Sequence, residues 1–413
     1  MELYYSFSIL IVLAALFSYL NLRFLKLPST IGIMLLAMIT SIAMVAIGRS
    51  YPELLTRFSG IFESVNFTEV LMGAMLNFLL FAGAIHISMH DLRKQRIPII
   101  IFSTLGVIIS TVLVGVFMYY VFMFFTINVP FIQCLMFGAL ISPTDPIAAI
   151  SFLKKAGIRK SLEIKVSGES LFNDGVSVLL FSLLLQLSQG TEVDLTFKHI
   201  TGLFVQETGG GLFMGLVFGY LGSRGIRKIN DYNVTVMITL AIVMGGYLVA
   251  RYLHISSPLM MVAAGLVIGN YGKATAMSAA DKDYLDKFWE LIDEILNAML
   301  FLIIGFELML IPDLQQYWKI GLIAIAIVLL ARFFSLWLPI RFIPRIGRFD
   351  RKTITIMVWG GLRGGVSVAL ALTIDDHLHQ HLFISITYYV VVFSILVQGL
   401  TIGKLAAMQR SKA

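Results

Sequence analysis

FGALISPTDPIAAISFL at residues 137–153 and ESLFNDGVSVLLFSLLL at residues 169–185 are hydrophobic enough to cross a bilayer, yet together they contain three carboxylates. An acidic side chain at the centre of a membrane helix costs roughly 3 kcal/mol. Asp145, Glu169 and Asp174 therefore need a protein interior, water, a cationic partner or a bound ion. The two stretches predict a site for ions or protons within a membrane.

The composition of the whole chain agrees with this interpretation. Of the 413 residues, 58% are hydrophobic and 13% are charged, and the mean hydropathy is +0.88; the charged share is about half that of a soluble domain. Apolar runs of roughly twenty residues, the length of a membrane-spanning helix, recur along the chain. The alternation of a β-barrel is missing. We therefore expect an all-α polytopic membrane protein.

We predict about thirteen transmembrane helices and a single transmembrane domain over residues 1–404, followed by a short tail at 405–413. The N-terminus lacks the basic region and cleavage site of a signal peptide, so the first apolar run is taken as a span. The predicted spans are 3–22, 29–48, 67–88, 97–125, 131–152, 168–188, 203–222, 233–252, 257–271, 288–310, 317–340, 353–373 and 382–404.

Basic residues are distributed unevenly between the two sets of loops. Of the 31 Lys and Arg residues, 24 lie in loops after odd-numbered spans or in the tail, and five lie in loops after even-numbered spans. The positive-inside rule then places the C-terminus in the cytoplasm and the N-terminus outside, in a plasma membrane or bacterial inner membrane. Because these residues are dispersed over short loops, the net charge of +7 does not indicate nucleic acid.

Two of the predicted spans contain helix-breaking residues. Pro143 and Pro146 flank Thr144-Asp145 in the fifth span, and WGGLRGGVS surrounds Arg363 in the twelfth. Proline removes a backbone donor, and glycine leaves helical geometry easily. The two spans would be equivalent in inverted repeats at about 3–188 and 233–404, with a linking helix at about 203–222. Interrupted helices at corresponding positions of such repeats indicate the binding site of a transporter.

The spacing of polar residues in the sixth span suits a cation. Ser170 and Asp174 are four residues apart and share one helix face, and Glu169 and Asn173 share the neighbouring face. Oxygen ligands of this kind suit hard cations. An Asp in this setting can bind a desolvated cation or a proton, but not both at once. Such competition is sufficient for exchange if the site opens to one side at a time.

Two arginines, Arg332 and Arg363, are the cationic residues that lie within spans and away from the span ends. One should pair with Glu169, because an uncompensated buried charge costs several kcal/mol; we favour Arg332, as a structural bridge. Asp145 can offset positive N-terminal helix ends and Arg363 negative C-terminal ends. In the alternative functional interpretation, Thr144 supplies a carbonyl or hydroxyl to the ion and Asp145 binds it through water. Glu307, near the end of a span, is expected at the membrane interface.

The motifs SPTDPIA, GESLFNDG and GGLRGG resemble those of the monovalent cation:proton antiporters, in the electroneutral branch that contains NhaP proteins and sodium–proton exchangers. The resemblance implies an elevator-like homodimer with two crossed unwound helices, in which a core domain moves against a dimerisation domain. It implies that Asp174 binds the cation and carries the proton. The residues that would complete or support the site are Ser170, Glu169, Thr144, Asp145, Asn173, Arg332 and Arg363.

From the resemblance we expect one-for-one exchange of Na⁺ for H⁺, with Li⁺ and K⁺ as alternative cations, because Asn173 stands where the electrogenic branch has a second Asp. K⁺/H⁺ exchange, a cation channel and a non-transporting receptor are the competing hypotheses. We expect no cofactor and no enzymatic activity, because the sequence contains no nucleotide loop, zinc spacing or hydrolytic triad. The expected partners are monovalent cations, protons, the bilayer and a second copy of the chain.

Overall fold

The computed structural model describes residues 2–48, 51, 73, 75–145, 150, 158–190, 197–229, 231–311, 314–346 and 349–410. Almost all of them are helical. The first half contains α1 (Glu2–Leu20), η1 (Asn21–Leu25), α2 (Ser29–Gly48), α5 (Leu76–Ile85), α6 (Met89–Lys94), α7 (Arg96–Ile101), η3 (Phe102–Gly106), α8 (Val107–Phe124), α9 (Phe131–Ile141) and α11 (Lys160–Ser188).

The second half is also helical. It contains α12 (Phe197–Ile226), α13 (Tyr232–Leu253), α14 (Ser257–Val267), η4 (Ile268–Gly272), α15 (Lys273–Ala276), α16 (Ala279–Leu310), α17 (Trp318–Phe342), η5 (Pro344–Ile346), α18 (Arg351–Trp359), α19 (Gly365–Leu372), η6 (Asp376–Leu378), α20 (Gln380–Phe393), η7 (Ser394–Gly399) and α21 (Leu400–Arg410).

The helices confirm the predicted fold class. Seven helices in the described part of the chain are long and apolar enough to cross a bilayer. Helix also overlaps each of the thirteen predicted ranges wherever those ranges are described. The count of thirteen stays a prediction, because parts of the third and fifth ranges, including 67–72 and 146–149, lie outside the described residues.

Two helices begin well before the predicted spans that they contain. α11 begins at Lys160 instead of 168, and α16 begins at Ala279 instead of 288. The first turns of both helices carry charged residues, so the apolar pattern does not extend over them. A capping box starts α16: the Asp281 N–H donates to Ser278 Oγ over 3.2 Å, and the Ser278 N–H donates to Asp281 Oδ2 over 3.3 Å.

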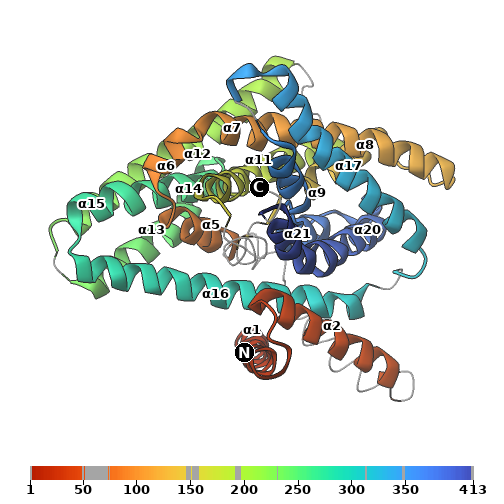
Figure 1. Ribbon diagram of the computed structural model, residues 1–413, viewed down its shortest axis with the longest axis horizontal. Coiled ribbons are helices and arrows are strands. Elements are labelled where there is room, and N and C mark those ends of the chain that lie inside the picture. The colour runs from red at the N-terminus through yellow and green to blue at the C-terminus, as the bar shows by residue number, and fades with distance from the viewer. Residues whose placement is uncertain are drawn as a thin grey trace.

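The helices form two groups that α16 connects (Figure 1). α12, α13, α14 and α15 lie on one side, α8, α17 and α20 lie on the other, and α16 passes below both. Glycines allow close packing within the first group. A Cβ at Gly211 or Gly215 of α12 would overlap main-chain carbonyls of α14 or of the residue before it. The Gly209-Gly210-Gly211 run is therefore part of a close helix contact, as small residues favour.

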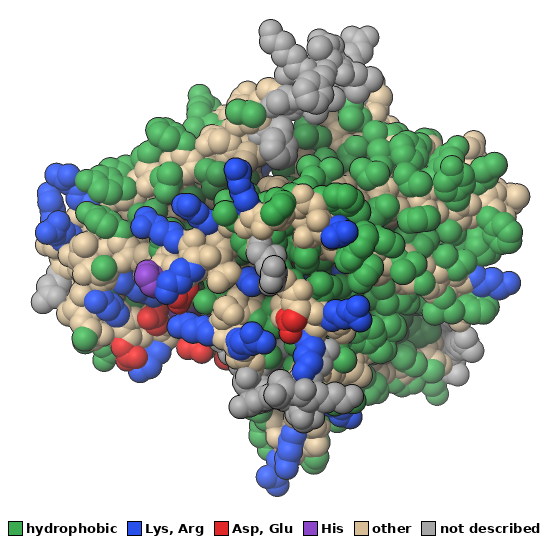
Figure 2. Space-filling model, turned by 45° about the horizontal axis from the view of Figure 1, so that its top comes forward, with side chains coloured by type: hydrophobic (Ala, Val, Ile, Leu, Met, Phe, Trp, Pro, Cys, Tyr) green, Lys and Arg blue, Asp and Glu red, His purple; other side chains and the backbone are tan. Residues whose placement is uncertain are grey.

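The buried apolar residues form two separate clusters. The first contains residues of α9, α17, α20 and the second half of α16, such as Phe306; the second contains residues of α5, α14 and the first half of α16, such as Trp289. α11 also contributes to both. The surface is broadly apolar on one side, and basic residues gather elsewhere, as a membrane protein requires (Figure 2).

Candidate functional site

The two predicted helix breaks lie against each other. α9 ends at Ile141 and is followed by non-helical residues up to Asp145, while α18 and α19 are separated by residues 360–364. The Asp145 N–H donates to the Leu362 carbonyl over 2.7 Å, in an isolated antiparallel bridge. The main chain that follows α9 is thus joined to the break between α18 and α19. Pro146 lies outside the described residues.

Glycines in the second break make room for the crossing. A Cβ at Gly364 would overlap the carboxyl group of Asp145, and one at Gly361 would overlap the Arg332 guanidinium. Glycine is the residue that leaves space for such an approach of backbone to a charged side chain. The GGLRGG motif is therefore explained by packing as well as by backbone freedom.

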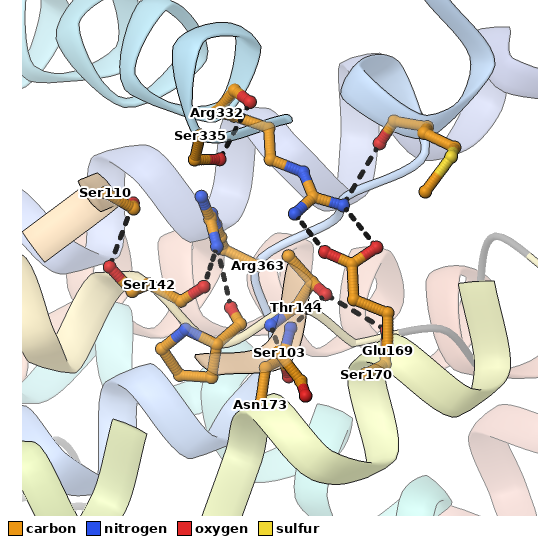
Figure 3. A network of polar contacts seen from close by, with 12 residues as sticks. Ser103, Ser110, Ser142, Thr144, Glu169, Ser170, Asn173, Arg332, Ser335 and Arg363 are labelled. Carbon is orange, nitrogen blue, oxygen red and sulfur yellow. Dashed lines mark hydrogen bonds and ion pairs between the residues drawn. The ribbon is translucent and has the colours of Figure 1, made fainter. Parts of the chain in front are cut away.

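Arg363 neutralises the end of the first half-helix (Figure 3). Its Nη1 donates to the main-chain carbonyls of Ser142 and Pro143, and the distance to the Pro143 oxygen is 3.0 Å. These carbonyls follow the last turn of α9, where the helix dipole is negative. The arginine is 2% exposed, so its charge is placed close to this end without solvent. The arrangement is the charge compensation that the sequence indicated for Arg363.

The C-terminal segment supports the second break from behind. The Arg363 N–H donates to Ser394 Oγ over 2.8 Å, and Ser394 Oγ donates to Gln398 Oε1 over 2.8 Å. Gln398 Nε2 then donates to the Trp359 carbonyl over 3.0 Å. Sequence reasoning missed this support. Its one signal is a pair of polar residues four apart, Ser394 and Gln398, in a largely apolar span.

Glu169 and Arg332 form a buried ion pair. Arg332 Nη1 donates to Glu169 Oε1, and Nη2 donates to Oε2 over 3.1 Å. Nη2 also donates to the Met357 carbonyl over 3.3 Å. Glu169 is 1% exposed and Arg332 is 7% exposed, so both charges are desolvated and each needs the other. The pair favoured from the sequence is the pair that the structure contains, and it connects α11, α17 and α18.

Asn173 holds the first break against α11. Its Nδ2 donates to Thr144 Oγ1 over 2.8 Å, and its Oδ1 accepts a longer bond of 3.4 Å from the Thr144 N–H. Thr144 Oγ1 also lies 3.0 Å from Ser170 Oγ. All three side chains are buried. The sequence placed Thr144, Ser170 and Asn173 near one site, and the structure brings them into direct contact (Figure 3).

Asp174 follows Asn173 on α11 and is partly buried. Within the described residues, no hydrogen bond or ion pair to its carboxylate is found. Asp145, also partly buried, lies close enough for the two carboxylates to interact electrostatically. The site therefore contains one carboxylate compensated by arginine, Glu169, and two acidic groups near the crossing. Asp174 is thus an acidic group of the site for which the described residues show no ion pair.

Glu307, which the sequence placed near the end of a span, is buried within the protein. It is only 7% exposed and lies within electrostatic reach of the buried Tyr388 of α20. The long helix α16 packs closely against α2 at this level, where a Cβ at Gly305 would overlap Ala37. Position near the end of an apolar run did not reveal this burial, which depends on packing between distant segments.

A helical membrane protein in which the non-helical end of one helix meets the break in another, with buried countercharges beside them, has the architecture of a secondary transporter. The chain belongs to the sodium/hydrogen exchanger family: the family model for the transmembrane sodium/hydrogen exchanger matches residues 11–407. It is 46% identical over 400 residues to the Na⁺/H⁺ antiporter NhaP of Pseudomonas aeruginosa, with coverage of 96% of this chain and 94% of the relative.

A second relative and a solved structure agree with this assignment. The Na⁺/H⁺ antiporter NhaH of Halobacillus dabanensis is 31% identical over 403 residues, with 96% of each chain covered. The structure of the sodium proton antiporter MjNhaP1 from Methanocaldococcus jannaschii has a TM-score of 0.76 at 20% identity, covering 98% of this chain and 99% of that one. The latter similarity establishes the fold.

Proposed function

We propose that this protein is an electroneutral antiporter that exchanges Na⁺ for H⁺ across the cell membrane by alternating access. The observation that carries the proposal is the position of Asp174, which has no ion pair within the described residues and follows directly on the Thr144–Ser170–Asn173 network. The name of the 46% identical relative, a Na⁺/H⁺ antiporter, supports Na⁺ as the cation. No observation favours K⁺.

Asp174 would bind Na⁺ and H⁺ in turn. The hydroxyl oxygens of Thr144 and Ser170, 3.0 Å apart, would supply neutral oxygen ligands of the kind that Na⁺ accepts. Asp145 would contribute through water, and Glu169, held by Arg332, would support the site without changing its charge. A protonated Asp174 cannot bind the cation, so one ion leaves when the other binds.

One-for-one exchange follows from this division of roles. Asn173 is neutral, and its amide is engaged with Thr144. Asp174 would then be the one carboxylate whose charge changes during the cycle, and each orientation of the transporter would carry either one Na⁺ or one H⁺. Alternating access would move the crossed helices against the α12–α14 group, in a homodimer whose tail faces the cytoplasm, as the basic loops favour.

Transport assays in everted vesicles or proteoliposomes test the proposal. Adding Na⁺ should collapse a preformed pH gradient, and protein with Asp174→Ala should give no response. Unchanged exchange by that variant would overturn the assignment. Parallel assays with Li⁺ and K⁺ at several pH values rank the cations. Electrical current measured across the same membranes distinguishes electroneutral exchange, which produces no current, from a channel, which does.

A further inference from the structure

Two buried asparagines outside the described site have the same unusual hydrogen bonding. Asn77 Nδ2 of α5 donates to the Gly73 carbonyl over 3.0 Å, and Asn297 Nδ2 of α16 donates to the Asp293 carbonyl over 2.8 Å. Asn77 is 1% exposed and Asn297 is 2% exposed. In the described part of the chain, neither Oδ1 atom has a hydrogen-bond partner. Buried acceptors of this kind need a water or an ion.

The packing of α5 on α16 places Asn77 beside the turn of α16 that contains Asp293. His86 Nδ1 lies 3.4 Å from Asp286 Oδ1, and the Phe81 and Phe78 rings lie 4.6 and 6.0 Å from the Trp289 ring. Residue numbers thus fall along α5 as they rise along α16, so the helices are antiparallel. Continuing the register by one turn places Asn77 level with Asp293.

The same face of α16 turns toward the crossing. Asp293, Asn297 and Leu300 follow at spacings of four and three residues and so lie in one stripe. A Cβ at Gly365, the first residue of α19, would overlap the Leu300 side chain, and a Cβ at the preceding Gly364 would overlap Asp145. Asp293 also lies close enough to Asp145 for electrostatic interaction. The stripe therefore borders the site that contains Asp145 and Asp174.

The stretch of α16 around Asp293 and Asn297 lies between the two apolar clusters. Trp289 is the last fully buried α16 residue of one cluster, and the buried α16 residues of the other cluster begin at Met299. Asp293 and Asn297 thus lie between the fully buried parts of two apolar clusters, in a stretch where Ile292 and Leu296 also pack against those clusters. Polar and ionisable side chains at such a depth in a membrane protein typically mark the path of an ion.

We propose that Asp293, with the amide oxygens of Asn297 and Asn77, forms a second cation subsite through which Na⁺ passes on its way to or from Asp174. One carboxylate and two neutral amide oxygens suit a partly hydrated monovalent cation. The neutral amide oxygens bind the cation weakly enough for its release to the next site, as conduction through successive sites requires. The inference rests on the proposed Na⁺/H⁺ exchange.

Initial rates of exchange against Na⁺ concentration, measured in proteoliposomes, test the subsite. Asp293→Asn and Asn297→Leu should each raise the apparent KM for Na⁺ at least about tenfold, the size expected for one lost ligand to a charged group, with kcat within about twofold of the original. Glu294→Gln is the matched control, because Glu294 is the next residue on α16 and is exposed. The control should leave KM unchanged.

The outcomes separate the two proposals. If the original protein shows no Na⁺-dependent exchange, the proposed function fails. If it exchanges Na⁺ but both substitutions leave KM at the control value, the amide oxygens bind only water and the subsite is refuted. Asn297→Asp preserves the side-chain size and adds a charge, so it should lower KM severalfold. Should the other two variants fail to fold, an unchanged KM in Asn297→Asp refutes the subsite.

Discussion

The main-chain N–H of Asp145 donates to the carbonyl of Leu362 over 2.7 Å, and this bond joins the segment that follows α9 to the break between α18 and α19. The residues on either side of the bond have opposite electrostatic roles. Asp145 carries the acidic group of the first break, and Arg363, which follows Leu362, neutralises the carbonyl end of α9. The contact therefore places the acidic group of Asp145 close enough to Asp174 for the two to interact electrostatically.

The Glu169–Arg332 pair should be essential for stability. Glu169→Gln or Arg332→Gln alone leaves an uncompensated buried charge, so each should lower the free energy of unfolding by about 3–5 kcal/mol. The double substitution removes both charges and should be less harmful than the sum of the two. Thermal unfolding of purified protein in detergent measures this coupling. Additive effects would show that the two side chains do not interact.

Gly364 should not tolerate a side chain. A Cβ there would overlap the Asp145 carboxyl group, so Gly364→Ala should push the two breaks apart and reduce exchange at least about tenfold, as expected for small displacements of positioned groups. Gly245→Ala is the control, because a Cβ at that position on α13 meets no atom within 4 Å in the described structure. Equal exchange rates in the two variants would contradict this account of the crossing.

Asn173 should position Thr144. Asn173→Ala removes both contacts to Thr144 and leaves the buried Thr144 N–H without that acceptor, which should cost about 1–3 kcal/mol. Exchange should fall because the first break loses its attachment to α11. Asn233→Ala is the control, since Asn233 is an exposed residue in the first turn of α13. Full exchange by Asn173→Ala at normal expression would refute this role.

Asp350 caps α18, the half-helix that leads to the second break. Its carboxylate accepts bonds from the Thr353 hydroxyl and from the Thr353 N–H, the latter over 3.3 Å. The hydroxyl bond in particular lowers the pKa of Asp350. Because the folded-state pKa lies below the unfolded one, the stabilisation is present above the unfolded pKa and is lost as pH falls through the folded pKa.

Removing this cap should therefore have a pH-dependent effect. Asp350→Ala should lower the free energy of unfolding by about 1 kcal/mol at neutral pH. The difference in Tm between the original protein and the variant should shrink below about pH 4, the ordinary range of an Asp carboxyl. A difference that persists unchanged into acid would show that the ionised carboxylate does not provide the cap.

Local chemistry explains which features could be predicted from the sequence. Proline and glycine break helices through their own backbones, so the interruptions after Ile141 and Trp359 were visible in the motifs. Hydropathy identified the membrane helices because burial in a bilayer selects apolar side chains along a whole span. The starts of α11 and α16 were missed because their first turns are charged, and a charged helix has no apolar pattern to detect.

Some features that depend on contacts between distant segments could not be predicted, although the Glu169–Arg332 pair could. Ser394 supports Arg363 from 31 residues away, and the unpartnered oxygens of Asn77 and Asn297, as the described residues show them, are recognisable only once burial is known. Glu307 is buried by helices far away in the chain. The roles of Asp174, Ser170 and Thr144 in binding an ion stay predictions, because contacts between side chains do not identify the ligands of an ion.

Proton release on Na⁺ binding tests the central claim most directly. Calorimetric titration of purified protein with Na⁺, repeated in buffers of different ionisation enthalpy, measures the number of protons released, because a ligand that needs a deprotonated carboxylate must displace its proton. The account predicts release approaching about one proton per chain at acidic pH, and none from Asp174→Asn. Equal proton release from the original protein and from Asp174→Asn would contradict it.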